Sequence, residues 1–438
     1  MAGVVDTIEV ERRTPFGENP VVGARGTKTQ RRILLAALDV FAKHGYHDSR
    51  IEQITEAAGC SRPAFYQYFS SKEDVFRALA SHVSRTVADM TERLGAITAD
   101  REGRAALATW LREFADFFDL YAPVFSGFSA ATRSNADLVD ASAVVSKAFA
   151  RRLRPHLRLD TDAVRRDVTA SIVVTMVVRA NLLRVAGGAL ADRARFVESL
   201  AGLIHRILVG PVPELDGGSQ PAPPGPAVEP PTPVAQRDPG SDAAAGRTLS
   251  RQGQRMRARI IEAGTTVFPR LGFHETRVDD IVAAAGASHG SFYRYFDSKE
   301  DLFRVIATEA VDHLMSCIEA FPQAGDVAAL RDWWVRWFRT YADHGGIIAV
   351  WREGPFADPM LAELTAHTVR QWLDRLAAVL DGRGVSDPRV DAMGFLGLIE
   401  TIPHHVQALG YFDEEPAIDA LVAICSRGFF GMATGVAS

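Results

Sequence analysis

The sequence of 438 residues predicts an all-α fold made of two similar units. Residues 32–77 align without a gap with residues 259–304, and 23 of these 46 positions are identical. Apolar residues recur at helical spacing in both copies and in the region after each copy, and no sustained period-two alternation indicates a strand. One helical module is therefore expected twice in the chain, each time followed by a larger helical region.

Capping and turn residues divide the first copy into four helices. These are expected from Thr27 to Gly45, over Arg50–Ala58, from Ser61 and from Ser71. Ser49 with Glu52 has the spacing of a capping box for the second helix, and Gly59 closes that helix. Pro63 lies in the first turn of the third helix, where its missing N–H costs no helical hydrogen bond.

The second copy repeats these signals with one difference. Thr276 with Asp279 corresponds to the capping box, Gly286 to the closing glycine and Ser288 to the cap of the third helix. Pro269 has no counterpart in the first copy. Because it lies in the last turn of the first helix, we expect a local distortion there.

The remaining helices and the composition of the connections set the expected domain boundaries. Further helices are predicted over 104–121, 134–156, 161–186 and 192–209, and over 326–343, 358–381, 388–409 and 415–430. Proline, glycine and alanine dominate residues 211–248, which indicates a linker. The expected order is a flexible leader (1–25), a first small domain (26–75), a first large domain (76–210), the linker (211–248), a second small domain (249–302) and a second large domain (303–438).

Charge is distributed unevenly along the chain. The net charge is −5, which by itself argues against a nucleic-acid partner. Between residues 25 and 47, however, five basic residues oppose one acidic residue, and between residues 247 and 272 six arginines oppose one glutamate. Positive charge at the start of both copies favours contact with phosphates, with solvated helix faces as the simpler alternative.

Cysteine use and hydropathy indicate a protein of the reducing cytoplasm. Cys60, Cys317 and Cys425 are scattered and show no metal-binding spacing, and the start of the chain lacks the pattern of a signal peptide. The longest apolar stretch, 168–185, contains Arg179 and is therefore not expected to span a membrane. We expect no membrane segment, no metal and no cofactor.

Two short helices joined by a tight glycine turn form a helix-turn-helix, in which the second helix enters the major groove of DNA. Gly59 and Gly286 supply the turns. Four phenylalanines are expected in the core, with the neighbouring tyrosines off that face: Phe65, Phe69, Phe292 and Phe296. The motif therefore predicts double-stranded DNA as a partner.

The candidate DNA-contacting residues lie around the second and third helices of each copy. They are Ser49, Arg50, Ser61, Arg62, Pro63, Ala64, Tyr66, Gln67, Tyr68 and Lys72 in the first copy, and Thr276, Arg277, Ser288, His289, Gly290, Ser291, Tyr293, Arg294, Tyr295 and Lys299 in the second. The tyrosines and lysines can reach phosphates. Positions 62, 64 and 67, which correspond to 289, 291 and 294, can reach base edges and differ between the copies.

These motifs resemble those of the TetR family of bacterial transcriptional regulators. The resemblance rests on the AAGxS turn (57–61, 284–288), the FYxYF box (65–69, 292–296) and the SKED start of the next helix (71–74, 298–301). It implies that each unit joins a three-helix DNA-binding domain to a helical domain for ligand binding and dimerisation. Most members carry one unit per chain and dimerise, so the resemblance implies an intrachain pseudo-dimer here.

Aromatic residues crowd the helices after each copy, and a hydrophobic effector is expected among them. The candidate pocket residues are Trp110, Phe114, Phe118, Phe125, Trp333, Trp337, Trp351, Trp372 and His404. Packing of a core is the simpler explanation of the same residues, because a large apolar pocket and a core use the same side chains.

One further pattern in the sequence is similar to an enzyme motif. Residues 286–290 match the GxSxG motif of serine hydrolases, but that motif needs a strand before the serine. A helix is expected there, so we predict no catalytic residue and no enzyme activity.

Arg179 and Glu400 hold near-equivalent places in two late apolar helices. We hypothesise that they face one another between the units, with pocket lining as the alternative.

The sequence thus predicts a ligand-responsive transcriptional repressor that reads an imperfect palindrome with two non-identical recognition helices. It is expected in the cytoplasm, associated with the nucleoid, and further self-association of the chain stays open. The alternative is an apolar small-molecule binding protein with little affinity for DNA.

Overall fold

The computed structural model describes residues 24–133, 149–157, 162–186, 192–216, 250–322, 326–351, 359–381 and 387–432. These residues form helices and contain no strand, so the predicted all-α fold is confirmed. The chain divides into two compact units, Met1–Gly210 and Pro211–Ser438. Most of the expected leader, the linker and the helix predicted over 134–156 lie outside the described residues.

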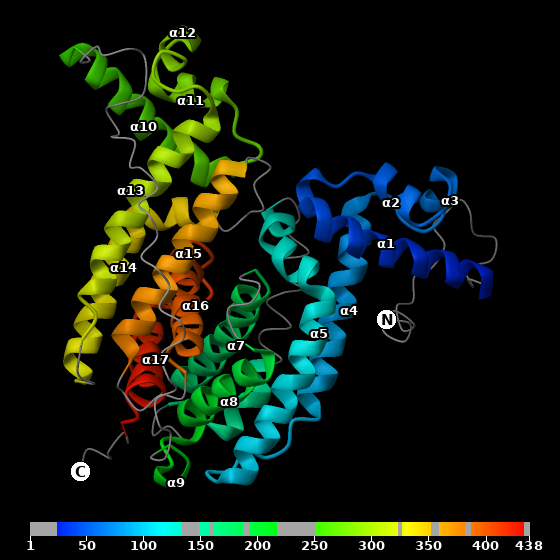
Figure 1. Ribbon diagram of the computed structural model, residues 1–438, viewed down its shortest axis with the longest axis vertical. Coiled ribbons are helices and arrows are strands. Elements are labelled where there is room, and N and C mark those ends of the chain that lie inside the picture. The colour runs from blue at the N-terminus through cyan, green and yellow to red at the C-terminus, as the bar shows by residue number, and fades with distance from the viewer. Residues whose placement is uncertain are drawn as a thin grey trace. The chain divides into compact units, whose positions relative to one another are not determined.

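The first unit contains two short helices at one end and longer helices that lead away from them (Figure 1). Its helices are α1 (Ala24–Asp48), α2 (Ile51–Ala57), α3 (Arg62–Tyr66), α4 (Lys72–Glu92), α5 (Arg101–Arg133), the 3₁₀ turn η1 (Arg154–His156), α7 (Ala163–Ala186) and α8 (Arg193–Val209). Gly45 interrupts the helical geometry of α1 with φ 73°, at the position where the sequence predicts its end.

The second unit repeats this order. Its helices are α9 (Pro213–Asp216), α10 (Arg251–Leu271), α11 (Val278–Ala285), α12 (His289–Phe292), α13 (Lys299–Glu319), α14 (Val327–Trp351), α15 (Pro359–Leu380), α16 (Pro388–Gln407), α17 (Glu414–Ile424) and the π turn η2 (Cys425–Phe429). As in the first unit, α11 and α12 lie at one end, and α13 leads from them into the larger helical region (Figure 1).

The local distortion expected at Pro269 does not interrupt the helix, which corrects that expectation. Helix α10 continues through Pro269 to Leu271, and the Gly272 N–H donates to the Phe268 carbonyl at 2.8 Å to close the last turn. The proline ring also packs on α14, because a Cβ at Gly346 would lie 3.0 Å from Pro269 Cβ. The glycine at 346 therefore provides room for the proline.

Both predicted capping boxes are displaced by one residue. The N-cap of α2 is Arg50, whose N–H donates to Gln53 Oε1 at 2.8 Å, and the N-cap of α11 is Arg277, whose N–H donates to Asp280 Oδ2 at 2.9 Å. The residue before each N-cap, Ser49 or Thr276, is turned into the core instead.

One described helix, α7, is long and apolar enough to cross a membrane by length and composition alone. However, 67% of that stretch is buried inside the protein, as is usual for a core helix. Packing inside the protein therefore accounts for its apolar character.

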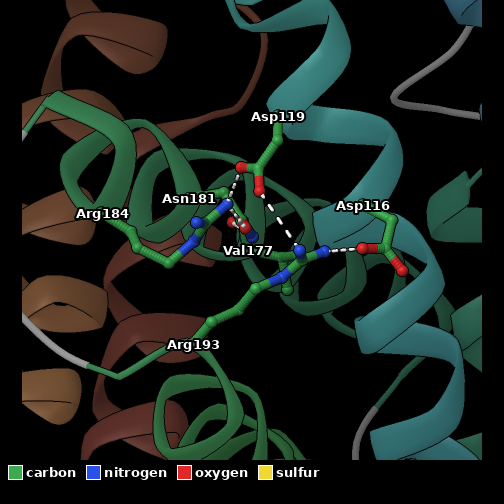
Figure 2. A network of polar contacts seen from close by, with 6 residues as sticks. All are labelled: Asp116, Asp119, Val177, Asn181, Arg184 and Arg193. Atoms are coloured by element: carbon green, nitrogen blue, oxygen red, sulfur yellow. Dashed lines mark hydrogen bonds and ion pairs between the residues drawn. The ribbon is translucent and has the colours of Figure 1, made fainter. Parts of the chain in front are cut away.

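Polar contacts fasten the end of α7 and the start of α8 to α5 (Figure 2). Arg184 of α7 forms an ion pair with Asp119 of α5, and the Arg184 side chain is only 10% exposed. Arg193 of α8 pairs with Asp116 and lies 3.6 Å from Asp119. Asn181 adds an oxygen 3.4 Å from Arg184 Nη2. Because Asp119 faces both arginines, it joins three helices.

We predict that Arg184→Ala loosens this junction. Removing the mostly buried guanidinium breaks the tie between Asp119 and α7 and leaves Arg193, 3.6 Å away, as the remaining partner of Asp119, which should cost about 2 kcal/mol of unfolding free energy. Hydrogen exchange of α7 and α8 peptides, read together with denaturant midpoints, measures the effect. The matched control is Arg112→Ala, since Arg112 pairs with Glu198 across α5 and α8 at 3.1 Å with both side chains about half exposed. Exposed pairs contribute about 0–1 kcal/mol, so equal losses in the two variants would contradict the prediction.

Candidate nucleic-acid interface

The same apolar joint holds the two short helices together in each unit. Ile54 of α2 and Phe65 of α3 are fully buried, and so are Ile281 of α11 and Phe292 of α12. The four phenylalanines expected in the core are all at most 2% exposed. The predicted burial of these phenylalanines is therefore confirmed in both copies.

The turn between the helices has the same backbone geometry in both copies. Gly59 and Gly286 have φ of 58° and 56°, a left-handed conformation that glycine adopts without steric cost. The next N–H, of Cys60 or Ala287, donates back to the carbonyl of Thr55 or Val282 at 3.0 or 2.9 Å. This bond closes the helix and sets the direction in which the following helix starts.

A serine caps the recognition helix in each copy. Ser61 Oγ accepts a hydrogen bond from the Ala64 N–H at 3.3 Å, and Ser288 Oγ accepts one from the Ser291 N–H at 3.2 Å. Because helix α11, and not a strand, precedes the turn, Ser288 lacks the setting of a hydrolase nucleophile. Its hydroxyl is used as a helix cap.

The outer face of each recognition helix is open to solvent. In α3 the exposed residues are Arg62, Pro63 and Tyr66, with Ala64 and Gln67 half-buried. In the second copy the exposed residues are His289, Gly290, Tyr293 and Arg294, with Ser291 and Tyr295 half-buried. The structure thus brings the three candidate base-reading positions of each copy onto or beside one accessible face.

Three of the predicted contact residues lie in the core. Ser49 and Thr276 are 2% and 1% exposed, and their hydroxyls donate to the carbonyls of Gly45 and Gly272. Tyr68 is 4% exposed, so the expectation that it lies off the core face is wrong. Helix α3 ends at Tyr66, and the chain turns before Tyr68, so helical periodicity does not extend that far.

Lys72 and Lys299 are engaged inside the protein. Lys72 Nζ donates to the carbonyls of Tyr46, His47 and Ser49 at 2.9, 2.7 and 3.2 Å. Lys299 Nζ makes the same three bonds with the carbonyls at 273, 274 and 276, at 2.8, 3.2 and 2.8 Å. Burial lowers the pKa of Lys72 and that of Lys299 from the ordinary lysine value. Their contact with phosphates stays a prediction, and the three donors of each ammonium already have acceptors.

Each copy contains a contact between the two short helices that the sequence patterns did not predict. Arg62, the first residue of α3, forms an ion pair with Glu52 of α2. His289, the first residue of α12, lies with Nε2 2.5 Å from Oδ1 of Asp279 of α11. In both copies the acidic residue lies ten residues before the basic one. The alignment of the two copies shows this shared spacing and is the signal from which the pair could have been found.

The candidate pocket residues form aromatic clusters. Trp110 stacks on Phe114, Phe118 stacks on Phe125, and Trp333 stacks on Trp337, with ring centroids 5.3, 4.2 and 5.4 Å apart. Of the other candidates, Trp351 and Trp372 are buried and His404 is half-buried. These contacts place the aromatic candidates in well-packed parts of the units.

In each unit a tryptophan donates a hydrogen bond to a carbonyl of the preceding long helix, α4 or α13. Trp110 Nε1 donates to the Met90 carbonyl at 3.0 Å, and Trp333 Nε1 donates to the Cys317 carbonyl at 2.9 Å. Met90 and Cys317 are separated by 227 residues, the offset of the repeat. The similarity of the units therefore continues beyond the 46 aligned residues, into the contact of α4 with α5 and of α13 with α14.

Comparison with known proteins matches both copies to one family. The family model described as bacterial regulatory proteins, tetR family, matches residues 33–79 and 260–306. The uncharacterized HTH-type transcriptional regulator YdgC of Bacillus subtilis is 36% identical over 89 residues, which are 19% of this chain and 46% of that protein. The HTH-type transcriptional activator FasR of Mycolicibacterium smegmatis is 35% identical over 123 residues, or 27% of this chain and 54% of that protein. The chain spans about half the length of these relatives.

A solved structure gives a weaker match. A TetR-like transcriptional regulator from Rhodococcus sp. RHA1 is 22% identical, with a TM-score of 0.35 over 42% of this chain and 98% of that chain.

We predict that the main effect of Lys72→Met is a lower free energy of unfolding and not the loss of a contact with DNA. Methionine keeps the length of the side chain but leaves three carbonyls without a charged donor, at an expected cost of about 1.5–3 kcal/mol. Thermal unfolding and faster amide exchange over residues 45–50 measure the loss. The control is Lys43→Met on the exposed surface of α1, which should stay within about 0.5 kcal/mol. A Lys72→Met protein that is as stable as the control but binds DNA weakly would assign the ammonium to DNA instead.

Proposed function

Because the chain belongs to the TetR family of bacterial regulatory proteins and carries two of its DNA-binding modules in tandem, we propose that it is a sequence-specific transcriptional regulator. The observation that carries the proposal is the pair of accessible recognition faces, held by the same glycine turn and serine cap in both copies. Helices presented in this way fit the major groove of duplex DNA.

The two recognition faces read different bases. The capped scaffold is shared, whereas the accessible residues at 62, 64 and 67 are replaced by others at 289, 291 and 294. Arginine at 294 can donate two hydrogen bonds to guanine, and glutamine at 67 can pair with adenine. The operator is therefore an imperfect palindrome whose half-site centres lie about one helical turn, 34–36 Å, apart.

We predict that selection from a random DNA library recovers two unlike half-sites. Arg294→Ala should flatten base preference at one position of one half-site and cost about 1–3 kcal/mol of binding free energy. Tyr66→Phe should instead weaken binding to all sequences alike, because it removes a phosphate contact. Arg339→Ala is the control, since it removes an exposed arginine from α14 with the same change of net charge. Recovery of a perfect palindrome would contradict the prediction.

The two units pair within one chain as a pseudo-dimer. Support comes from the tandem modules, since a palindromic site needs two recognition helices. Arg179 of α7 is half-buried and Glu400 of α16 is 6% exposed. In this pairing they face one another and disfavour association of like units.

We predict that Glu400→Arg causes loss of the single-chain monomer, because two arginines would then meet in the pairing of the units. Native mass spectrometry measures the number of chains per particle, and thermal unfolding measures stability. The exchange of both charges in Arg179→Glu with Glu400→Arg should restore the monomer. A single variant that stays monomeric and stable, or a double variant that is no better than the single one, would contradict the pairing.

A hydrophobic effector controls DNA binding, and repression is the proposed mode. Two buried tryptophans of the second unit, Trp334 and Trp372, have indole N–H groups without an acceptor among the described residues. Buried donors usually find an acceptor, so a mainly apolar molecule that carries hydrogen-bond acceptors suits this unit. The same native mass spectra report any small molecule that purifies with the chain.

The competing function is that of an apolar-ligand binding protein with little affinity for DNA. An electrophoretic shift with the DNA upstream of its own gene separates the two, because absence of specific binding at low salt would favour the ligand-binding protein. For the regulator we propose a cytoplasmic location and no enzymatic activity.

A further inference from the structure

The two recognition helices begin with different basic residues, and each of these is paired with an acid on the preceding helix. Glu52 holds Arg62 in the first copy, and Asp279 holds His289 in the second. Positions 52 and 279 are equivalent in the repeat, as are positions 62 and 289. Both partners have therefore changed between the copies, while the contact between them is kept.

Stability is a weak reason for keeping such a contact. All four side chains are more than half exposed, with values of 57% and 54% in the first pair and 54% and 74% in the second. Exposed ion pairs contribute little to folding. A carboxylate beside the recognition helix also repels phosphates, so the acid does not favour DNA affinity either.

The acidic partner instead sets the orientation of the side chain that reads the base. A free arginine or histidine at the first position of a short helix would lose rotamer freedom on meeting DNA. The guanidinium has five N–H donors in a rigid fork, so a carboxylate can occupy some of them and leave others directed outward. In the imidazole, the contact at Nε2 leaves Nδ1 as the nitrogen available to a base.

On these grounds, and resting on the proposed function in DNA binding, we propose that Glu52 and Asp279 are positioning residues for specificity. Each acid orients the basic side chain that begins its recognition helix and thereby sets base preference at one position of its half-site. The cost is a lower affinity for DNA of any sequence. Neither acid touches a base itself.

The test compares base preferences selected from a random DNA library by the full chain and its variants. Glu52→Gln should reduce the preference at one position of one half-site about fivefold or more, while binding to non-specific DNA stays equal or becomes tighter. Asp279→Asn should do the same in the other half-site only. Glu56→Gln removes another exposed carboxylate from α2 and should change overall affinity without changing any base preference.

The outcomes separate this proposal from the function on which it rests. A wild-type chain that selects no sequence would overturn the regulator function itself. A wild-type chain that selects a site, with Glu52→Gln behaving like Glu56→Gln, would overturn only the positioning role.

A transplant of the pair gives a second, independent readout. Glu52→Asp with Arg62→His installs the pair of the second module in the first. The double variant should acquire at that position the base preference of the other half-site, whereas Arg62→His alone should lose preference there. Identical profiles for the single and double variants would show that the acid has no part in orienting the base reader.

Discussion

The ammonium group at the first residue of α4 and of α13 joins each DNA-binding module to the helix that leaves it. It reaches three carbonyls that follow Gly45 or Gly272 in the chain, and these carbonyls converge because the two glycines turn the chain with positive φ. An aromatic ring lies 4.9 Å from each ammonium, that of Tyr46 or Phe273. The position of the recognition helix relative to the larger helical region depends on this junction.

The two modules share what holds the helices and differ in what the helices present. The glycine turn, the serine cap, the buried phenylalanines and the lysine junction recur at an offset of 227 residues. The accessible positions of α3 and α12 differ, and so does the acid-base pair at their start. In a dimer of identical chains such differences cannot arise, because both recognition helices come from one gene segment. A tandem chain is free of this constraint.

The units also differ in how their larger helical regions are fastened. In the first unit, Asp119 of α5 faces arginines of α7 and α8 (Figure 2). In the second unit Arg331 of α14 pairs with Glu415 and Asp419 of α17, and hydrogen bonding with Asp419 raises the pKa of Arg331. The charge that joins the helices is thus acidic on α5 and basic on α14. Each set of ion pairs ties a late helix of the unit, α8 or α17, to the long helix α5 or α14.

Local signals in the sequence were sufficient for the fold class, the repeat, the helix-turn-helix and its capping serines. Such features depend on residues close together in the chain: apolar side chains at helical spacing, glycine where φ is positive, and a hydroxyl before a helix. The resemblance to a known family rested on the same residues. Helix ends at Gly45 and Gly59 follow from backbone sterics alone.

Only the tertiary structure decided which polar residues are accessible. Ser49, Thr276 and Tyr68 have residue types suited to DNA, but their side chains fill the core beside the turn. Lys72 and Lys299 reach carbonyls 23 to 26 residues away in the chain, a contact that no local pattern specifies. The pairs of Arg62 with Glu52 and of His289 with Asp279 likewise depend on the angle between two helices. Periodicity determines which residues can share a face, whereas packing of distant segments determines which of them meet a partner and which meet solvent.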